Sequence, residues 1–395
     1  SLAVARIERA ITNNEKVLVY GDYDVDGTTS VAMMFSFLRD KIKSIEYYIP
    51  CRYNEGYGIS IKGIDYAKEN NFTLIVALDC GIRAIDQVHY AKNNGIEFII
   101  CDHHNPSEKL PDAFAILNPR QKDCLYPYKD LSGCGVGFKL IQAFSQINGI
   151  EFAEIQEYLD LLVLSIGADI VPMTGENRIF AFHGLKIVNN NPRAGLRALL
   201  VAANKVNNIT MQDLIFGIAP RINAAGRIEH AKKAVDILVE KDYANAKLIA
   251  EKIEKNNITR KDLDQSITKE ALEMIDEKNK STVVYSKNWH KGVVGIVASR
   301  LIESYYKPTI VLSEKNGILT GSARSVHDFN LYDAINKCAY LCENFGGHKY
   351  AAGLTIKKVN LSQFISEFEK AVSEKITNDQ LTPKINIDKI IDISE

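Results

Sequence analysis

The segment KVLVYGDYDVDGTTS, residues 16–30, decides the fold of the N-terminal part of the chain. Its first residues, Lys16–Gly21, form a short apolar run that is typical of a buried strand. Asp22, Asp24 and Asp26 follow directly, so carboxylates gather where this strand ends. Because ligands of open α/β sheets bind at the carboxyl ends of strands, the segment predicts a functional site at that edge.

Further apolar runs alternate with helical patterns, which is typical of a mostly parallel sheet wrapped by helices. The additional strands that we expect are Glu46–Cys51, Thr73–Leu78, Glu97–Cys101 and Ala113–Leu117. Two of them also end in polar residues. Thr73–Leu78 leads into Asp79-Cys80-Gly81, and Glu97–Cys101 leads into Asp102-His103-His104. We therefore expect three polar clusters to converge at one edge of the sheet.

These clusters have the composition of a metal site. Oxygen-rich sites with one or two imidazoles suit Mn²⁺ or Mg²⁺, whereas a structural zinc ion would recruit cysteine. So many carboxylates in a small volume would repel one another without cations. Two divalent ions about 3.5–4 Å apart would relieve this repulsion and activate a hydroxide. Asp79 is the best candidate to bridge both ions, and Asp169, which follows the apolar helix Tyr158–Ile166, could complete the set.

Each cluster taken alone has a simpler interpretation. A run of alternating aspartates can be a solvated turn or a calcium loop, although the EF-hand pattern fails because Met33 stands at its twelfth position. The histidine pair could belong to a polar loop, and Asp79 could cap a helix. The occurrence of all three clusters at successive strand ends favours a shared site.

The C-terminal part predicts a second α/β unit after a helical linker. Residues 229–279 contain no proline or glycine and have apolar residues at helical spacing, with Asn256–Asn257 as a possible break between two helices. Strands are expected at Thr282–Tyr285, Thr309–Leu312 and Ile318–Ser322, and helices at Gly292–Tyr305, Asn330–Leu341 and Leu361–Ile376. The expected domains are therefore 1–228, the linker 229–279, 280–378, and a final segment 379–395.

Bulk composition is that of an ordinary globular protein. Of 395 residues, 46% are hydrophobic and 25% are charged, and no apolar stretch approaches the length of a membrane span. Seven cysteines without a CxxC pair fit a reducing compartment, so we expect the cytoplasm. The net charge of −1 argues only weakly against a nucleic-acid partner, because bound metal ions reverse the local charge of carboxylates.

Several motifs of the chain resemble those of a known family. Asp102-His103-His104 is the motif that gives the DHH phosphoesterases their name, and within that superfamily the chain resembles the RecJ exonucleases. The second unit resembles a DHHA1 domain. The segments that carry the resemblance are GDYDVDGTTS (21–30), CRYNEGYG (51–58), LDCG (78–81), GADIVPM (167–173), RINAAGR (221–227), KGVVGIVASRL (291–301), GSARS (321–325) and GGHKYAAG (346–353).

The resemblance implies a role for each matching residue. The residues implied to hold two metal ions are Asp24, Asp26, Asp79, His103 and Asp169, with Asp22 close by. His104 would meet the scissile phosphate, and Asp102 would orient the neighbouring histidines. The residues implied to lie near the 5′-terminal phosphate are Arg52, Ser322 and Arg324, and those implied to contact DNA are Asn223, Arg227, Gly346, Gly347 and His348.

General chemistry supports the phosphate-binding assignments, although alternatives remain. Arginine offers a planar fork for a phosphate, and paired glycines let backbone N–H groups approach one closely. Arg52 could instead pair with Glu55, and Gly346-Gly347 could be only a tight turn.

The implied function is 5′→3′ hydrolysis of single-stranded DNA to 5′-mononucleotides, in DNA repair and recombination. The implied partners are single-stranded DNA, a single-strand-binding protein and a helicase. An alternative is the same chemistry on short oligonucleotides, cyclic dinucleotides or pyrophosphate. A non-catalytic DNA-binding scaffold and an accessory role in aminoacyl-tRNA metabolism are further alternatives, which the full set of acidic residues disfavours. The family usually continues into an OB-fold module, and Lys384–Ile393 is expected to be its first strand.

Overall fold

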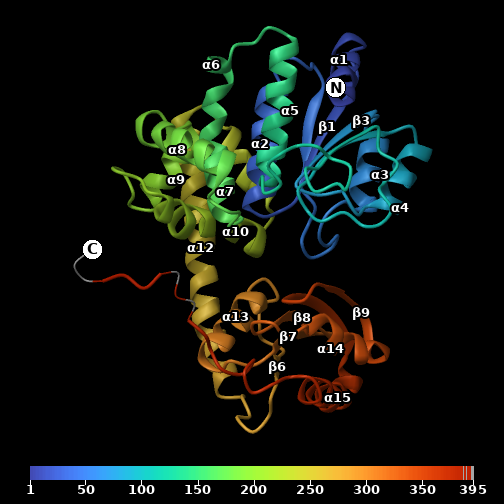
Figure 1. Ribbon diagram of the computed structural model, residues 1–395, viewed down its shortest axis with the longest axis vertical. Coiled ribbons are helices and arrows are strands. Elements are labelled where there is room, and N and C mark those ends of the chain that lie inside the picture. The colour runs from blue at the N-terminus through green and yellow to red at the C-terminus, as the bar shows by residue number, and fades with distance from the viewer. Residues whose placement is uncertain (386, 388, 393–395) are drawn as a thin grey trace. The chain divides into compact units, whose positions relative to one another are not determined.

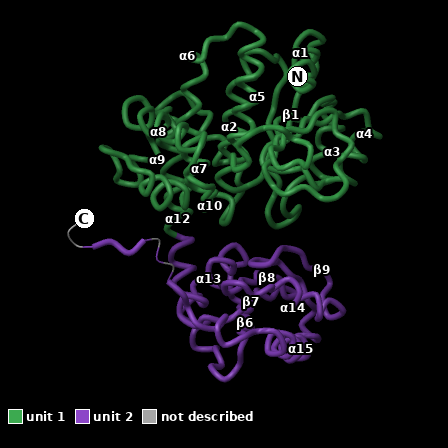
Figure 2. Tube along the Cα trace, in the orientation of Figure 1, with its two compact units in different colours: residues 1–258 green, residues 259–395 purple. Residues whose placement is uncertain are grey.

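The computed structural model describes residues 1–385, 387 and 389–392, and its chain divides into two compact units. Unit 1 comprises Ser1–Ile258 and unit 2 comprises Thr259–Glu395 (Figure 2). Helix α12 (Tyr243–Leu272) contains the division between them. None of the described helices is long and apolar enough to cross a membrane.

Unit 1 is built on a five-stranded, fully parallel sheet with the order β2-β1-β3-β4-β5 (Figure 1). The strands are β1 (Val17–Gly21), β2 (Ile45–Tyr48), β3 (Leu74–Leu78), β4 (Glu97–Cys101) and β5 (Ala115–Leu117). All the strands expected for this part form, but β2 ends at Tyr48 rather than Cys51 and β5 begins at Ala115 rather than Ala113. The α/β fold class is therefore confirmed.

The strands alternate their side chains between two cores because successive residues of a strand point to opposite faces. Val17, Val19 and Val76 pack on one face against helices α1 (Leu2–Thr12), α2 (Val25–Leu38) and α5 (Gly133–Ile147). Leu18, Tyr20 and Ile75 pack on the other face against α3 (Ile61–Glu69) and α4 (Ile85–Asn93). Both faces are covered, as a parallel sheet requires.

A helical layer completes unit 1. Its helices are α6 (Phe152–Ile155), α7 (Leu159–Ala168), α8 (Gly175–Asn190), α9 (Ala194–Ala202), a π-helical segment Asp213–Ile218, α10 (Ala219–Ile228) and α11 (Lys232–Val239). Helix α7 is buried almost throughout, with Leu161–Leu164 fully shielded from solvent. The possible break between two helices at Asn256–Asn257 does not occur, because α12 is continuous there. Both asparagines are buried, and tertiary packing outweighs their low helix propensity.

Unit 2 has a mixed five-stranded sheet with the order β6-β7-β8-β10-β9. Its strands are β6 (Thr282–Ser286), β7 (Thr309–Lys315), β8 (Ile318–Arg324), β9 (Cys342–Gly347) and β10 (Ala351–Lys357), and its helices are α13 (Val294–Ser304), α14 (Leu331–Lys337) and α15 (Leu361–Ser373). Helices α14 and α15 pack on one face of this sheet, and α13 packs on the other face at β7 and β8.

Two sequence expectations for unit 2 need correction. Strands β9 and β10 were not expected, because their glycines weaken any strand pattern. The expected helix Asn330–Leu341 ends as an α-helix at Lys337 and is followed by the 3₁₀ turn Ala339–Leu341. In the final segment, the described residues of Lys384–Ile393 form no strand. Residues 386, 388 and 393 lie outside the described residues.

An ion pair between Asp160, in α7, and Arg193 is expected to contribute to the stability of unit 1. Arg193 Nε lies 2.8 Å from Asp160 Oδ2, and only 2% of the Asp160 side chain is exposed. Asp160→Ala should lower the free energy of unfolding by about 3–5 kcal/mol, because it leaves a buried guanidinium without its partner. The measurement is urea unfolding followed by far-UV circular dichroism.

The matched control is Asp112→Ala, which removes the partner of the exposed Lys92. This change should cost no more than about 1 kcal/mol. Equal losses for the two variants would contradict the structural role assigned to the buried pair.

Candidate metal centre

Four segments deliver the candidate residues to the carboxyl edge of the sheet in unit 1. Asp22, Asp24 and Asp26 follow β1, Asp79 follows β3, and Asp102-His103-His104 follow β4. Asp169 stands at the C-terminal end of α7, where its N–H donates to the Ser165 carbonyl at 2.9 Å. The structure therefore brings together the clusters that the strand ends predicted.

The aspartate segment turns directly into helix α2. Asp24 caps this helix by accepting a hydrogen bond from the Gly27 N–H at 2.9 Å. A Cβ atom on Gly27 would lie 2.5 Å from the Asp22 carbonyl oxygen, so only glycine lets the chain fold back this tightly. Asp26 is thereby placed in the first turn of α2, facing the site.

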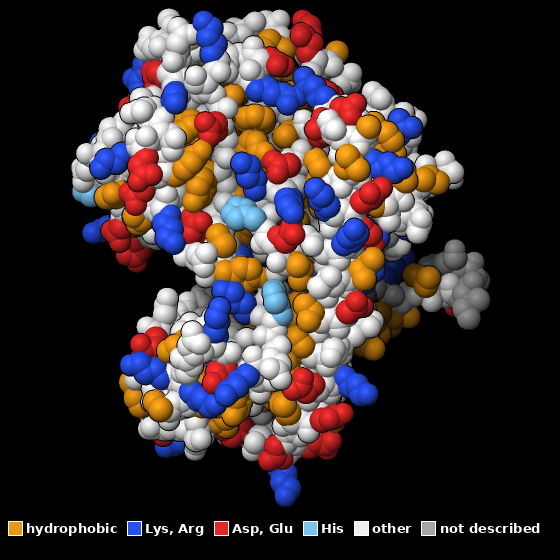
Figure 3. All heavy atoms as spheres, turned by 180° about the vertical axis from the view of Figure 1, so that it is seen from behind, with side chains coloured by type: hydrophobic (Ala, Val, Ile, Leu, Met, Phe, Trp, Pro, Cys, Tyr) orange, Lys and Arg blue, Asp and Glu red, His pale blue; other side chains and the backbone are white. Residues whose placement is uncertain are grey.

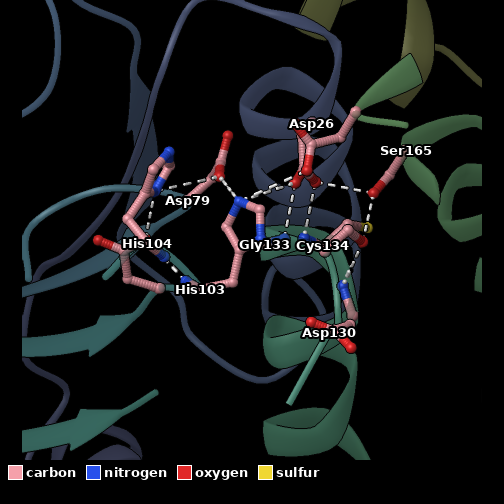
Figure 4. A network of polar contacts seen from close by, with 12 residues as sticks. Asp26, Asp79, His103, His104, Asp130, Gly133, Cys134 and Ser165 are labelled. Carbon is pink, nitrogen blue, oxygen red and sulfur yellow. Dashed lines mark hydrogen bonds and ion pairs between the residues drawn. The ribbon is translucent and has the colours of Figure 1, made fainter. Parts of the chain in front are cut away.

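Three donors fix the carboxylate of Asp26 (Figure 4). The Gly133 N–H donates to Oδ2 at 2.6 Å, the Cys134 N–H donates to Oδ1 at 2.8 Å, and Ser165 Oγ donates to Oδ1 at 2.7 Å. The two backbone donors belong to the first turn of α5, which favours a negative charge. Ser132 caps α5, because its Oγ accepts from the Gly135 N–H.

Asp79 has an unusual backbone conformation in the buried centre of the site. Its φ is +58°, a region that non-glycine residues seldom adopt, and the residue is 2% exposed. A Cβ on Gly133 would lie 2.5 Å from Asp79 Cβ, so a glycine is needed opposite it. Asp79 does not cap a helix, since α4 begins at Ile85. Strain of this kind clusters at functional sites.

His103 lies among three carboxylates. Its Nε2 is 3.2 Å from Asp79 Oδ1, 3.6 Å from Asp169 Oδ2 and 3.8 Å from Asp26 Oδ2. Two groups of donor atoms lie close enough together to hold a metal ion, and they share His103. The groups are Asp79, His103 and His104, and Asp26, His103 and Asp169.

Asp102 organises the histidine pair. Its carboxylate accepts from the Ile82 and His103 backbone N–H groups at 2.9 and 2.7 Å, and lies 2.7 Å from His104 Nδ1. Burial opposes ionisation of Asp102, but the hydrogen bond from His104, the charge of His104 and the backbone N–H donors together outweigh burial and lower the Asp102 pKa. At His104 burial lowers the pKa, but the hydrogen bond to Asp102 and the charges of Asp102, Asp169 and Asp26 together outweigh burial and raise the His104 pKa. His104 Nε2 also lies 2.9 Å from the hydroxyl of Tyr57.

The pKa values of four carboxylates, those of Asp22, Asp24, Asp79 and Asp169, are raised in the absence of cations. Burial, followed by repulsion from the Asp24 carboxylate, raises the pKa of Asp22, and burial followed by repulsion from Asp26 raises the pKa of Asp24 and of Asp79. The same two causes raise the pKa of Asp169 to about 8.

Several polar atoms of this cluster lack hydrogen-bond partners within the described part of the chain. They are both carboxylate oxygens of Asp22, Oδ1 of Asp79 and both ring nitrogens of His103. Buried polar atoms normally have partners, so these atoms suit a cation. The donor set of carboxylates and imidazole therefore fits Mn²⁺ or Mg²⁺.

The expected substrate-binding residues of unit 1 lie beside the aspartate segment. The Arg52 guanidinium stacks 4.0 Å from the ring centre of Tyr23. Arg52 does not pair with Glu55, whose carboxylate accepts instead from the Cys51 N–H and the Ser60 hydroxyl. Asn223 and Arg227 stand one turn apart on α10, where a Cβ on the neighbouring Gly226 would lie 3.3 Å from the Tyr23 carbonyl oxygen.

The expected substrate-binding residues of unit 2 form a second group around β8. A Cβ on Gly295, in the first turn of α13, would lie 3.1 Å from both Ser322 Oγ and Arg324 Nη2. Gly353 of β10 stands in register with Ser322 on one side and with Gly346 on the other. Gly346 and Gly347 belong to strand β9, so their interpretation as a tight turn is wrong; His348 follows them in the turn to β10.

Several residues of the site were not identified from the sequence. Ser165 lies inside an apolar helix, and the backbone donors of Gly133 and Cys134 carry no side-chain signature. A serine followed by closely spaced glycines at 132–137 was the available signal for a helix N-terminus facing an anion.

On the surface, Lys and Arg side chains are interspersed with Asp and Glu in the view of Figure 3, in keeping with the small net charge.

Comparisons with known proteins agree with this geometry. Residues 16–166 match the model of the DHH family, N-terminal domain, and residues 278–374 match the DHHA1 domain. The single-stranded-DNA-specific exonuclease RecJ of Bacillus subtilis is 37% identical over all of this chain, which spans 50% of that relative. RecJ of Salmonella typhimurium is 36% identical over 94% of this chain, which spans 69% of that relative. A crystal structure of exonuclease RecJ bound to manganese superposes with a TM-score of 0.85 at 30% identity, covering 95% of this chain and 94% of the other.

Repulsion between the buried carboxylates predicts that ionised Asp79 lowers the stability of the metal-free protein. Because the Asp79 pKa is raised in the folded protein, its ionised form destabilises the fold above the ordinary carboxyl pKa of about 4. At neutral pH without divalent cations, Asp79→Asn should therefore melt at a higher temperature than wild type, by about 2–4 °C for each kcal/mol relieved. Asparagine tolerates a positive φ. The measurement is differential scanning calorimetry in chelator.

Asp123→Asn, at an exposed position, is the control and should leave the melting temperature unchanged. The gain at Asp79 should disappear as the pH falls to about 4. Added Mn²⁺ should stabilise wild type more than Asp79→Asn. A lower melting temperature for metal-free Asp79→Asn at neutral pH would refute the repulsion.

Proposed function

Because the chain belongs to the RecJ family of single-stranded-DNA-specific exonucleases, we propose that it hydrolyses single-stranded DNA from the 5′ end and releases 5′-mononucleotides. The observation that carries this proposal is the cluster of Asp26, Asp79, His103 and Asp169, whose oxygen and nitrogen atoms converge, several of them buried and without hydrogen-bond partners among the described residues. The chain spans only half of the B. subtilis relative, so the activity of that longer protein is an inference here.

The residues proposed to hold two divalent ions, Mn²⁺ or Mg²⁺, are Asp22, Asp24, Asp26, Asp79, His103 and Asp169. When bound, such ions supply a hydroxide nucleophile and stabilise the charge that develops on the phosphate. His103 is shared by both groups of donor atoms, but one imidazole nitrogen has a single lone pair. Asp79 has two carboxylate oxygens and is the better bridge between the ions.

Two other residues are proposed to act on the phosphate directly or through a neighbour. His104 would donate to a non-bridging oxygen of the scissile phosphate. Its raised pKa favours the protonated ring, and its contact with Asp102 fixes the orientation of that ring. The charge of Asp102 is stabilised by three backbone N–H donors, those of Ile82, His103 and His104, so Asp102 can hold an imidazolium without taking its proton.

Each unit contributes its own proposed contacts to the strand. In unit 1, Arg52 would meet the 5′-terminal phosphate, and Asn223 and Arg227 would contact the DNA. In unit 2, Ser322 and Arg324 offer a hydroxyl and a guanidinium beside the first turn of α13, which is suited to a phosphate. Gly346, Gly347 and His348 would contact the DNA backbone, and open space lies over Gly346 where a side chain would otherwise stand.

The cellular role that we propose is DNA repair and recombination in the cytoplasm, with a single-strand-binding protein and a helicase as partners. The same metal chemistry on short oligonucleotides or cyclic dinucleotides is the alternative. A 5′-labelled single strand of about 30 nucleotides, with its duplex and a dinucleotide, distinguishes these substrates.

Removal of the proposed bridge should abolish turnover. Asp79→Ala should retain less than about a tenth of the wild-type rate in Mn²⁺, since metal activation supplies several kcal/mol. The measurement is release of labelled mononucleotide, with Asp123→Ala as the control. A higher residual rate would show that Asp79 is not the bridge, and cleavage of the dinucleotide alone would contradict the exonuclease assignment.

The 5′→3′ direction of hydrolysis should depend on recognition of the 5′-phosphate. Arg52→Ala and Arg324→Ala should each reduce the stimulation of the rate by a 5′-phosphate more than they reduce the rate on 5′-hydroxyl ends, because each removes a fork for the terminal phosphate. The check is a kinetic comparison of matched oligonucleotides. Equal losses on both kinds of end would indicate general backbone binding instead.

A further inference from the structure

Unit 1 has a basic hollow beside the metal centre that the proposed mechanism does not use. Its volume is about 590 Å³, and the residues that line it are Asn105, Pro119, Arg120, Gln121, Lys122, Cys124, Lys129 and Asp130. Three cationic side chains and one carboxylate line this hollow, which we call the Arg120 pocket. The imbalance of charge suits an anion, in contrast to the adjacent cluster of aspartates.

Arg120 is held rigidly in this pocket. Its Nε donates to the Lys129 carbonyl at 3.3 Å, its Nη1 donates to Asn105 Oδ1 at 3.3 Å, and its Nη2 donates to Asp130 Oδ1 at 3.2 Å. A guanidinium has five N–H donors. One N–H on each terminal nitrogen therefore remains without a partner among the described residues and is available to donate to a phosphate.

Buried amides connect Arg120 to two of the segments that carry metal-site residues, the one after β4 and the one after α7. The Asn118 amide donates to the His104 carbonyl at 2.8 Å, and its Oδ1 accepts from the Arg120 N–H at 2.7 Å. On the other side, the Asn177 amide donates both to the Asp130 carbonyl at 2.6 Å and to the Pro172 carbonyl at 3.0 Å. Pro172 lies in the loop that follows Asp169. Asn118 and Asn177 are 2% and 0% exposed, so these connections are shielded from water.

We propose that the Arg120 pocket binds a phosphate of the substrate strand other than the one being cleaved. The inference rests on the proposed function and adds a backbone subsite to it. The donors are fixed before binding, which reduces the ordering that binding requires. Lys122 is exposed and has no internal partner in the described part of the chain, so it can add a second positive charge to the same anion.

The test measures binding apart from turnover. Fluorescence anisotropy of a labelled single strand is recorded in chelator over a salt series for wild type and Arg120→Gln. Glutamine keeps a hydrogen-bonding side chain but removes the charge. Arg120→Gln should weaken binding about tenfold at low salt, and the slope of log K against log salt should fall by about 0.7 for the lost phosphate contact. Arg120→Lys should restore part of the slope.

The controls separate this role from a structural one. Arg39→Gln removes a charge at the end of α2, about 21 Å along the helix from its first turn, and should bind like wild type. Lys122→Gln removes the charge of a side chain that has no hydrogen bond or ion pair among the described residues, and it should lower the slope in the same direction as Arg120→Gln. In Mn²⁺, Arg120→Gln should raise KM more than it lowers kcat. An unchanged slope with a reduced kcat would overturn the subsite and leave Arg120 as a support for His104.

Three further outcomes have distinct meanings. If Arg120→Gln abolishes inhibition by a 5′-mononucleotide but leaves the affinity for the strand unchanged, the pocket holds the product, and the proposal is wrong. If wild type binds no single strand and cleaves none, the proposed function fails together with the subsite. A wild type that cleaves single strands, with an Arg120→Gln variant of equal affinity and slope, overturns the subsite alone.

Discussion

Mutual repulsion among buried carboxylates is the constraint on which the rest of unit 1 depends. Asp22, Asp79 and Asp26 are each no more than 2% exposed, and they lie at the ends of adjacent strands or in the helix turn that follows. The fold compensates only one of them fully, by aiming two backbone N–H groups and a serine hydroxyl at Asp26. Asp22 and Asp79 keep oxygens without hydrogen-bond partners in the described part of the chain, and their pKa values are raised, so the metal-free protein has an electrostatic cost that divalent cations would relieve.

Glycines and an unusual backbone conformation allow these carboxylates to lie close together. Gly27 and Gly133 each stand where a Cβ atom would lie 2.5 Å from an atom of Asp22 or Asp79, and Asp79 adopts a positive φ. These positions bring the carboxylates closer than a chain of larger residues would allow. Unit 2 uses glycine for a different purpose. Gly295, Gly346 and Gly353 leave room beside Ser322, where a phosphate rather than a metal ion is proposed to bind.

The sequence predicted what depends on strand ends and did not predict what depends on tertiary contacts. The parallel sheet and the convergence of Asp26, Asp79 and His103 follow from apolar runs that end in polar residues, because parallel strands align their carboxyl ends. Ser165 escaped notice because a serine in an apolar helix carries no local signal. Strands β9 and β10 escaped notice because their glycines lower strand propensity, although Gly346 and Gly353 leave open space over the sheet. The continuous helix through Asn256–Asn257 shows burial outweighing propensity.

The central claim is that the carboxyl edge of this sheet holds two metal ions bridged by one carboxylate. Electron paramagnetic resonance of the protein titrated with Mn²⁺ tests it most directly, because two ions about 3.5–4 Å apart are coupled and isolated ions are not. The account predicts two Mn²⁺ per chain, with the six-line signal of isolated Mn²⁺ suppressed as the second ion binds, and recovery of that signal in Asp79→Asn. A single Mn²⁺ per chain, or two that keep the spectrum of isolated ions, would contradict it.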